Sequence, residues 1–297
     1  MRIFHQNMQN YSGGNGIAAN GLRTRNAQFD RDFANIQNAM GGPSVLVAGF
    51  TELLNNTTTV GAIAARAAAL DPTLTSLVII GVGITVIGAR DEYIGIAWDP
   101  NNFTIQNGGQ VLFNSMNKRW ECHNTAAPLP ATIPTPGFVP GRKRKADSTE
   151  AADSRGVAYV HGTYNGNARI FAYMHNMHTV GDPSSAFSAL NSMMSAIHSA
   201  VGGPATRDYV GGDYNLDPRD PRRRAPLEYV CAETATGYWK DTTWYNCYDY
   251  WLTNSGPNQL PMTNPVINTA NAATHYQTLW SHASDHCGIS LQFPIGG

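Results

Sequence analysis

Short apolar segments of this sequence, each of which reads as a β-strand, repeatedly end in an acid, an amide or a histidine. The segment Val45–Phe50 is such a strand, and Glu52 follows it. The residues that stand in this way at or just beyond a predicted strand end are Asn7, Glu52, Asp213, Asn215, Asp249, Asp285 and His286. Ligands of sheet-based proteins bind at strand ends, where rigid backbone meets open space. The pattern therefore predicts a sheet-based fold with one polar site at the strand ends.

Helix-like segments alternate with the strand-like ones. Apolar residues at helical spacing predict helices over about 29–40 and 182–201, and the alanine-rich segment 58–70 predicts a third. Strands are expected at 2–8, 45–50, 76–88, 91–98, 156–162, 168–178, from 208, at 247–253 and after His286. This order mixes crossover connections with hairpins, so we expect one α/β domain over 1–297, a sandwich with mixed β-sheets.

The segment from about 99 to 154 lacks this regularity. Five prolines between Pro128 and Pro140 punctuate it, and the basic run Arg142–Lys145 and a polar stretch follow. Such a composition buries little apolar surface. We therefore expect a long surface insertion at about 99–154.

Charge gives no argument for a polyanionic partner from the molecule as a whole, because only 14% of residues are charged and the net charge is −1. Basic residues form local runs at 118–119, 142–145 and 222–224. Such runs contact phosphates, serve as import signals or are solvated loops. Arg142–Lys145 is the run that would direct nuclear import.

Location in the cell stays open between secreted and cytoplasmic. No apolar segment of about 18 residues or more occurs, so no transmembrane segment is expected, and the sequence starts without a signal peptide. The four cysteines lack the CxxC spacing of zinc sites. A Cys231–Cys247 disulfide is expected only if the protein is exported.

The residues at the strand ends suit metal-assisted chemistry. Carboxylates gathered at one edge repel one another unless a cation neutralises them, and oxygen ligands favour Mg²⁺, Mn²⁺ or Ca²⁺. Histidines beside such a site would let a base activate water while the metal offsets charge on phosphoryl oxygens. This equipment is typical of phosphate ester hydrolysis.

Seven short motifs resemble those of the endonuclease/exonuclease/phosphatase superfamily, which includes DNase I, and they occur in the same order. The motifs are Ile3–Met8, Gly49–Glu52, Ser154–Val157, Tyr173–His178, Gly212–Asn215, Tyr248–Tyr250 and Ser284–His286. Thr51 stands where the family usually has Gln. The resemblance implies a four-layered α/β sandwich in which two packed mixed β-sheets are flanked by helices.

The resemblance also implies roles for the matched residues. Glu52 would bind the metal, which is Mg²⁺ or else Mn²⁺ or Ca²⁺, with help from Asn7 and Asp285. Asp213 and Asn215 would orient the attacking water or the phosphate.

Two histidines would act in catalysis. His286 would be the general base, with Asp249 holding its tautomer and orientation. His178 is the preferred second imidazole and His175 is the alternative. Asp91, with Glu92 next to it, would be the acid that pairs with this second histidine.

Three arginines are candidate phosphate ligands, namely Arg155, Arg222 and Arg223. The function implied by the resemblance is that of a divalent-metal-dependent phosphodiesterase, an endonuclease that acts on DNA. A phosphoinositide phosphatase or a sphingomyelinase-like lipid phosphodiesterase is the alternative. A non-catalytic binding or toxin module on the same fold is the remote one.

Overall fold

The computed structural model describes most of the chain. The described residues are 1–13, 24–39, 44–54, 58–84, 91–114, 117, 119–136, 156–176, 183–203, 207–216, 228–230, 237–240, 243–246, 248–253, 265–267, 284, 286 and 288–292. Within these ranges, no helix is long and apolar enough to cross a membrane.

Among the described residues, seven strands form a first sheet, in which the first strand of the chain lies next to the last one. In spatial order its strands are β15 (Pro265–Ile267), β16 (Ile289–Gln292), β1 (Arg2–Tyr11), β2 (Val45–Leu54), β4 (Asp91–Trp98), β3 (Ser76–Ile84) and β7 (Thr132–Ile133). β1 is parallel to β2 and antiparallel to β16. The sheet is therefore mixed.

The second sheet also has seven strands in the described part of the chain. Their order is β11 (Glu228–Val230), β14 (Asp249–Thr253), β10 (Arg207–Asp213), β9 (Asn167–His175), β8 (Val157–Tyr164), β5 (Thr104–Asn114) and β6 (Arg119–Ala126). β10 is parallel to β9 and antiparallel to β14. Separately, β12 (Gly237–Lys240) pairs with β13 (Thr243–Asn246).

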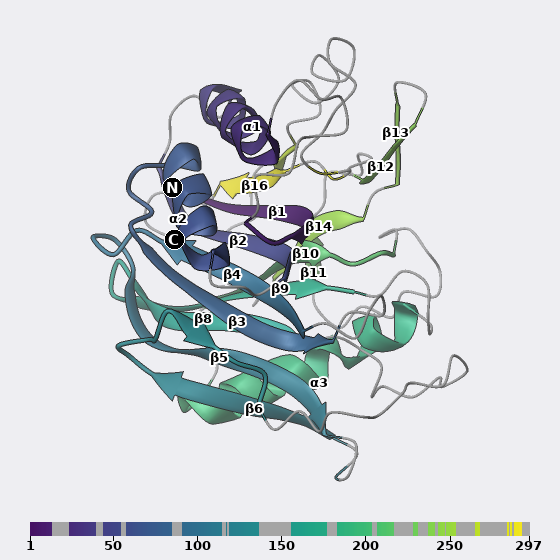
Figure 1. The fold of residues 1–297 in the computed structure, drawn as a ribbon. Coiled ribbons are helices and arrows are strands. Elements are labelled where there is room, and N and C mark those ends of the chain that lie inside the picture. The colour runs from purple at the N-terminus through teal and green to yellow at the C-terminus, as the bar shows by residue number, and fades with distance from the viewer. Residues whose placement is uncertain are drawn as a thin grey trace.

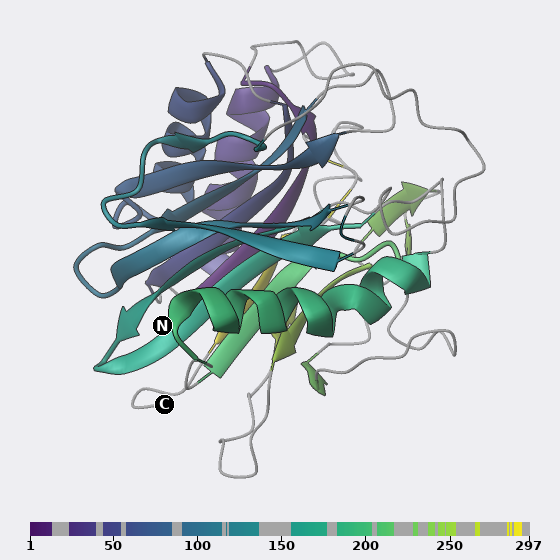
Figure 2. The same ribbon diagram turned by 90° about the horizontal axis from the view of Figure 1, so that it is seen from below.

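Helices cover the outer faces of the two sheets. Three apolar clusters separate four layers: one lies between the first sheet and the helices α1 (Arg25–Ala39) and α2 (Thr59–Leu70), one between the sheets, and one between the second sheet and α3 (Pro183–Val201). Figure 1 shows α1 and α2 beside the first sheet, and Figure 2 shows α3 across the second. The predicted four-layered α/β sandwich is confirmed.

Local sequence explains where the helices begin and end. Thr24 precedes α1 and its hydroxyl accepts the Ala27 N–H at 3.2 Å, as an N-cap residue does. Asp71 ends α2, and its carboxylate accepts the Val45 N–H at 2.7 Å. Gly202 follows α3 with φ +88°, which an L side chain resists. The Asp71 bond ties the end of α2 to the start of β2.

Part of the segment expected to be a surface insertion is sheet instead. Within the range 99–154, Thr104–Asn114, Arg119–Ala126 and Thr132–Ile133 form β5, β6 and β7, and 137–154 lie outside the described residues. Polar residues and glycines weaken the strand signal of β5 and β6. Gly109 permits their close approach, because a Cβ there would lie 2.0 Å from the His123 carbonyl oxygen.

The face of each sheet that meets the other sheet changes from apolar to polar toward one end of the molecule. Side chains alternate between faces along a strand, so residues two apart share a face. The inner-face series are Ile3, His5 and Asn7 in β1; Ile96, Ile94 and Glu92 in β4; Phe171, Tyr173 and His175 in β9; Tyr209, Gly211 and Asp213 in β10; and Trp251 and Asp249 in β14. The apolar members form the inter-sheet core, and the polar members continue it as a buried polar end.

Gly49 leaves space for an aromatic ring below this polar end. It pairs with His5 across β1 and β2, and a Cβ on it would lie 2.1 Å from Cδ1 of Tyr173. Tyr173 is fully buried and packs edge-on against Trp251. The glycine is therefore required by close packing between the sheets.

We predict that Gly49→Ala lowers the free energy of unfolding by about 1–3 kcal/mol, because the added methyl group overpacks the core. Gly61→Ala is the matched control: a Cβ there meets nothing within 4 Å, so in α2 it should raise stability by up to about 1 kcal/mol. Urea denaturation measures both. Equal stability of Gly49→Ala and the unmodified protein would contradict the packing argument.

A histidine–aspartate pair joins α3 to β10 away from the polar end. Nε2 of His198 lies 2.8 Å from Oδ2 of Asp208, which is fully buried. This hydrogen bond raises the pKa of His198 above its usual 6.5, and partial burial opposes the rise. A histidine with a raised folded-state pKa stabilises the fold fully below its unfolded pKa and loses that contribution as the pH rises through the folded-state value.

We therefore predict that His198→Gln is less stable than the unmodified protein at about pH 5.5 by up to about 1 kcal/mol. The difference should shrink toward about pH 8.5, where the imidazole is neutral in both states. Urea titrations at the two pH values measure this. A difference that grows with pH would show that the His198–Asp208 bond does not act through charge.

Candidate active site

One oxygen atom of Asp213, at the end of β10, is the centre of the buried polar end. Its Oδ2 accepts a hydrogen bond from Nδ2 of Asn7 at 2.9 Å. The Nε2 atoms of His286 and His175 lie 3.4 and 3.7 Å from the same oxygen. The other carboxylate oxygen accepts the Asn215 N–H at 2.9 Å. Groups from β1, β9 and the segment before β16 thus converge on one carboxylate.

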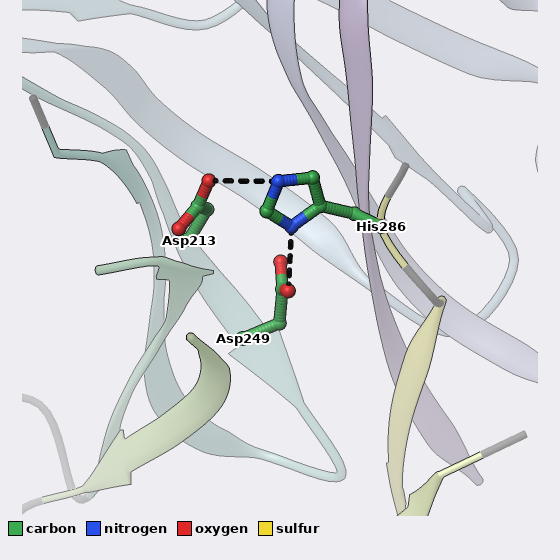
Figure 3. Close-up of side chains that lie close together, drawn as sticks. All are labelled: Asp213, Asp249 and His286. Carbon is green, nitrogen blue, oxygen red and sulfur yellow. Dashed lines mark hydrogen bonds and ion pairs between the residues drawn. The ribbon is translucent and has the colours of Figure 1, made fainter. Parts of the chain in front are cut away.

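Each imidazole that faces Asp213 is held by a second carboxylate. Nδ1 of His286 lies 2.8 Å from Oδ2 of Asp249, as Figure 3 shows. Nδ1 of His175 lies 2.6 Å from Oε1 of Glu92. Because an ionised carboxylate only accepts hydrogen bonds, each Nδ1 carries the proton and each Nε2 points to the centre. The site therefore has two carboxylate–imidazole pairs of the same kind, Asp249–His286 and Glu92–His175.

Burial makes this concentration of acids costly. The side chains of Asp249 and Glu92 are fully buried, and that of Asp213 is 1% exposed. Burial raises the pKa of Asp213, and the Asp249 charge raises it further, while His286, His175 and the Asn215 N–H oppose the rise. A nearby cation would reverse this effect and favour the ionised form.

A bulge in β2 changes the direction of Glu52. Phe50 and Leu53 both pack in the core under α1 and α2, and the pairing with β4 shifts between them. One extra residue therefore lies between them, and Glu52 adopts φ +60°. A non-glycine residue in this conformation stores strain that surrounding structure must impose. The bulge frees Glu52, which is half-buried, from the helix-covered face.

The two amide side chains at the site are oriented by backbone groups. Oδ1 of Asn7 accepts the Gln9 N–H at 2.8 Å, which turns its NH₂ group toward Asp213. Nδ2 of Asn215 donates to the Asn176 carbonyl oxygen at 2.7 Å. Asn176 is buried and donates in turn to the Tyr214 carbonyl oxygen. These bonds hold the ends of β9 and β10 together around Asp213.

The donor set fits a divalent cation. Ligand atoms of Asp213, Asp249 and His286 all lie within 4.8 Å of one another. His286 and Asp249 already bond to each other, so a cation among these three would displace that bond. The site also contains several buried carboxylates, and Glu52 and Asn7 add further side-chain oxygens. Hard divalent cations prefer such oxygen ligands.

Several residues to which the sequence assigned a role lie outside the described residues. They are His178, Asp285, Arg155, Arg222, Arg223, the basic run 142–145, Cys231 and Cys247. Their roles stay predictions.

Three residues of the site had no role assigned from sequence: His5, Thr51 and Glu92. Strand alternation would have found two of them, because His5 shares a face with Ile3, and Glu92 shares one with Ile94. By the same alternation Asp91 lies on the opposite face of β4 from Glu92. Glu92 is the acid that bonds to His175, and Nε2 of His175 lies 3.7 Å from Asp213. His178, the other histidine weighed, lies outside the described residues.

Solved structures share this architecture, whereas no protein-family model and no curated protein matches the sequence. The chain is similar to a mannosyl-6-phosphatase from Bacteroides thetaiotaomicron, with a TM-score of 0.58 and 14% identity over 99% of this chain and 100% of that one. It is also similar to an endonuclease/exonuclease/phosphatase from Bacteroides vulgatus, with a TM-score of 0.57 and 14% identity over 99% and 98%. The chain has the endonuclease/exonuclease/phosphatase fold.

A third similar structure is humanized D. rerio TDP2, with a TM-score of 0.53 and 12% identity over 99% of both chains. At such identities the likeness shows the fold and not the activity. The endonuclease/exonuclease/phosphatase fold, predicted from seven motifs, is thus confirmed.

We predict that Glu92→Gln removes the strongly downfield Nδ1–H proton resonance of His175, because a neutral amide replaces the carboxylate acceptor. Asp91→Asn, one residue away on the opposite face, is the matched control and should leave the resonance unchanged. Proton–nitrogen NMR spectra of the imidazoles measure both. Loss of the resonance in Asp91→Asn would contradict the pairing.

Proposed function

We propose that the protein is a divalent-metal-dependent phosphoric ester hydrolase, and that its substrate is a DNA phosphodiester. The observation that carries the proposal is the convergence of two carboxylate-held imidazoles on Asp213. Two imidazoles with fixed tautomers can remove one proton and supply another during a single displacement at phosphorus. The likeness to endonuclease/exonuclease/phosphatase structures supports the same reaction class.

His286 is the general base of the proposed reaction. Its Nε2 accepts the proton of the attacking water, and Asp249 stabilises the imidazolium that forms through the bond to Nδ1. Asp213, whose Oδ2 lies 3.4 Å from this Nε2, orients the attacking water beside both groups. Asn7 fixes the Asp213 carboxylate by its hydrogen bond.

His175 acts on the phosphate or the leaving group. Glu92 holds its Nδ1, so its Nε2 is directed to Asp213. His175 reaches this carboxylate from β9 of the second sheet, whereas His286 precedes β16 of the first sheet. As an imidazolium, His175 donates a proton to a phosphoryl oxygen or to the departing alkoxide. This assigns to His175 the role that the sequence had favoured for His178.

Glu52, Asn7 and Asp285 would hold the metal. Mg²⁺, or Mn²⁺ or Ca²⁺, would offset the negative charge that develops on the phosphoryl oxygens. The strained backbone of Glu52 supports this assignment, because strain of this kind gathers at functional positions.

The basic runs of the sequence support DNA as the substrate. Arg142–Lys145 and Arg222–Arg224, together with Arg155, offer positive charge to backbone phosphates. Binding through such contacts weakens steeply as salt is added.

A phosphomonoester is the second candidate substrate. The likeness to a mannosyl-6-phosphatase favours it, because the same two imidazoles serve a monoester equally well. Phosphoinositides and sphingomyelin belong to the same comparison as alternative substrates.

We predict that the protein with Mg²⁺ nicks supercoiled DNA, and that His286→Ala lowers kcat by about 100-fold or more, as loss of a general base does. EDTA should abolish the activity, and Mg²⁺ or Mn²⁺ should restore it. His198→Gln is the control, because His198 lies away from the site. Thermal unfolding checks that each variant folds.

The substrate class is decided by a panel of supercoiled DNA, RNA, mannose 6-phosphate, phosphoinositides and sphingomyelin, each with Mg²⁺ and with Mn²⁺. Intact DNA with phosphate released from a monoester would overturn the DNA assignment and keep the hydrolase. Inactivity on the whole panel, with no metal binding by calorimetry, would overturn both and favour a binding module.

A further inference from the structure

His5 is a third imidazole at the site, and two contacts fix its ring. It is fully buried on the inner face of β1, between Ile3 and Asn7. Its Nε2 lies 3.1 Å from the hydroxyl oxygen of Thr51. Its ring stacks on that of Tyr173, with centroids 6.2 Å apart and planes at 23°. These contacts determine where Nδ1 points.

Nδ1 of His5 faces the carboxylate that orients the catalytic base. It lies 3.7 Å from Oδ1 of Asp249, and His286 bonds to the other oxygen of the same carboxylate. Asp249 is fully buried and pairs with Asp213 across β14 and β10. The carboxylate therefore lies between two imidazoles, one at each oxygen.

We propose that His5 is a positioning residue for the general base: its Nδ1–H donates to Oδ1 of Asp249 and fixes the carboxylate whose other oxygen orients His286. The proposal rests on the proposed function for its kinetic consequence. Its structural content, a proton on Nδ1 of His5, stands without it.

The environment of His5 favours this tautomer. The two ring nitrogens of His5 face different groups, Nε2 a hydroxyl oxygen and Nδ1 a carboxylate oxygen. The Thr51 hydroxyl can donate to Nε2, which leaves the ring proton on Nδ1. Nδ1 has no hydrogen-bond partner among the described residues, so a proton there is best stabilised by the Asp249 oxygen.

The distance agrees with a bond that completes during catalysis. At 3.7 Å the two atoms are farther apart than a hydrogen bond. Bonds between catalytic groups shorten when substrate binds. An Asp249 held at both oxygens keeps the His286 imidazole in one orientation, as partners behind a catalytic histidine do.

Two substitutions separate the two nitrogens of His5. In His5→Asn the amide nitrogen takes the place of Nδ1 and keeps the donor toward Asp249. In His5→Gln the amide nitrogen takes the place of Nε2 and keeps only the contact with Thr51. With bis(p-nitrophenyl) phosphate and Mg²⁺, we expect His5→Gln and His5→Ala to lose about tenfold in kcat, as loss of such a partner does, with KM unchanged. We expect His5→Asn to retain most of the activity.

A double-mutant cycle identifies the route of the effect. If His5 acts through Asp249, then His5→Ala costs little further activity in the Asp249→Asn protein. Equal losses in both backgrounds, or equal losses in His5→Asn and His5→Gln, would overturn the proposal in favour of a packing role.

Proton–nitrogen NMR of the unmodified protein tests the proposal without activity and without any variant. The proposal requires the His5 proton on Nδ1, so a proton on Nε2 overturns it even if every His5 variant fails to fold. In His5→Ala the Nδ1–H resonance of His286 should shift. Should the unmodified protein hydrolyse no phosphate ester, the proposed function fails while these spectra still decide the tautomer of His5.

Discussion

The space between the two sheets constrains everything else in this structure. Stacked sheets lie about 10 Å apart, so each strand can place only alternate side chains in that space. Toward one end, the alternate positions are filled by Ile, Phe, Tyr and Trp, which exclude water. Toward the other end, the same positions hold His, Asp, Glu and Asn. The site therefore continues the inter-sheet core, and its side chains are held by hydrogen bonds where those of the core are held by apolar contacts.

This arrangement explains why the polar groups are so closely interlinked. A buried polar group without a partner costs more than most single apolar contacts contribute, so the polar end must satisfy itself. Asp213 does this by accepting bonds from Asn7 and the Asn215 N–H while facing two imidazoles. Each of these imidazoles also bonds through its Nδ1 to a second buried carboxylate, Asp249 or Glu92. Removing one member leaves others unpaired, so substitutions within this group are not additive.

Local patterns predicted a mixed α/β sandwich and the end of α3 at Gly202, and the resemblance to the superfamily implied the four layers. The start of α1 at Thr24 was missed, because the apolar spacing begins only at Phe29. β5 and β6 were missed because their glycines and polar side chains weaken the pattern, and the two strands form by pairing with each other and, for β5, with β8. At the site, residues at strand ends were found by position along the chain. His5 and Glu92 were not assigned roles because their importance depends on the face on which they lie, which contact between two sheets decides. The choice between His175 and His178 depends on where β9 ends, and strand ends are poorly determined by sequence.

The first sheet places β1 next to β16, and this has a consequence for how the protein is made. Gln6 donates a hydrogen bond to the His286 carbonyl oxygen across a separation of 280 residues. On a ribosome, which builds from the amino end, Asn7 and His5 emerge long before His286. Most strands of both sheets can pair before His286 is synthesised. The proposed base is added to the chain only just before β16. The nascent chain therefore carries an incomplete site until that strand docks, and contacts so distant in sequence form slowly. The order of synthesis would therefore delay the proposed activity until His286 reaches Asp213 and Asp249.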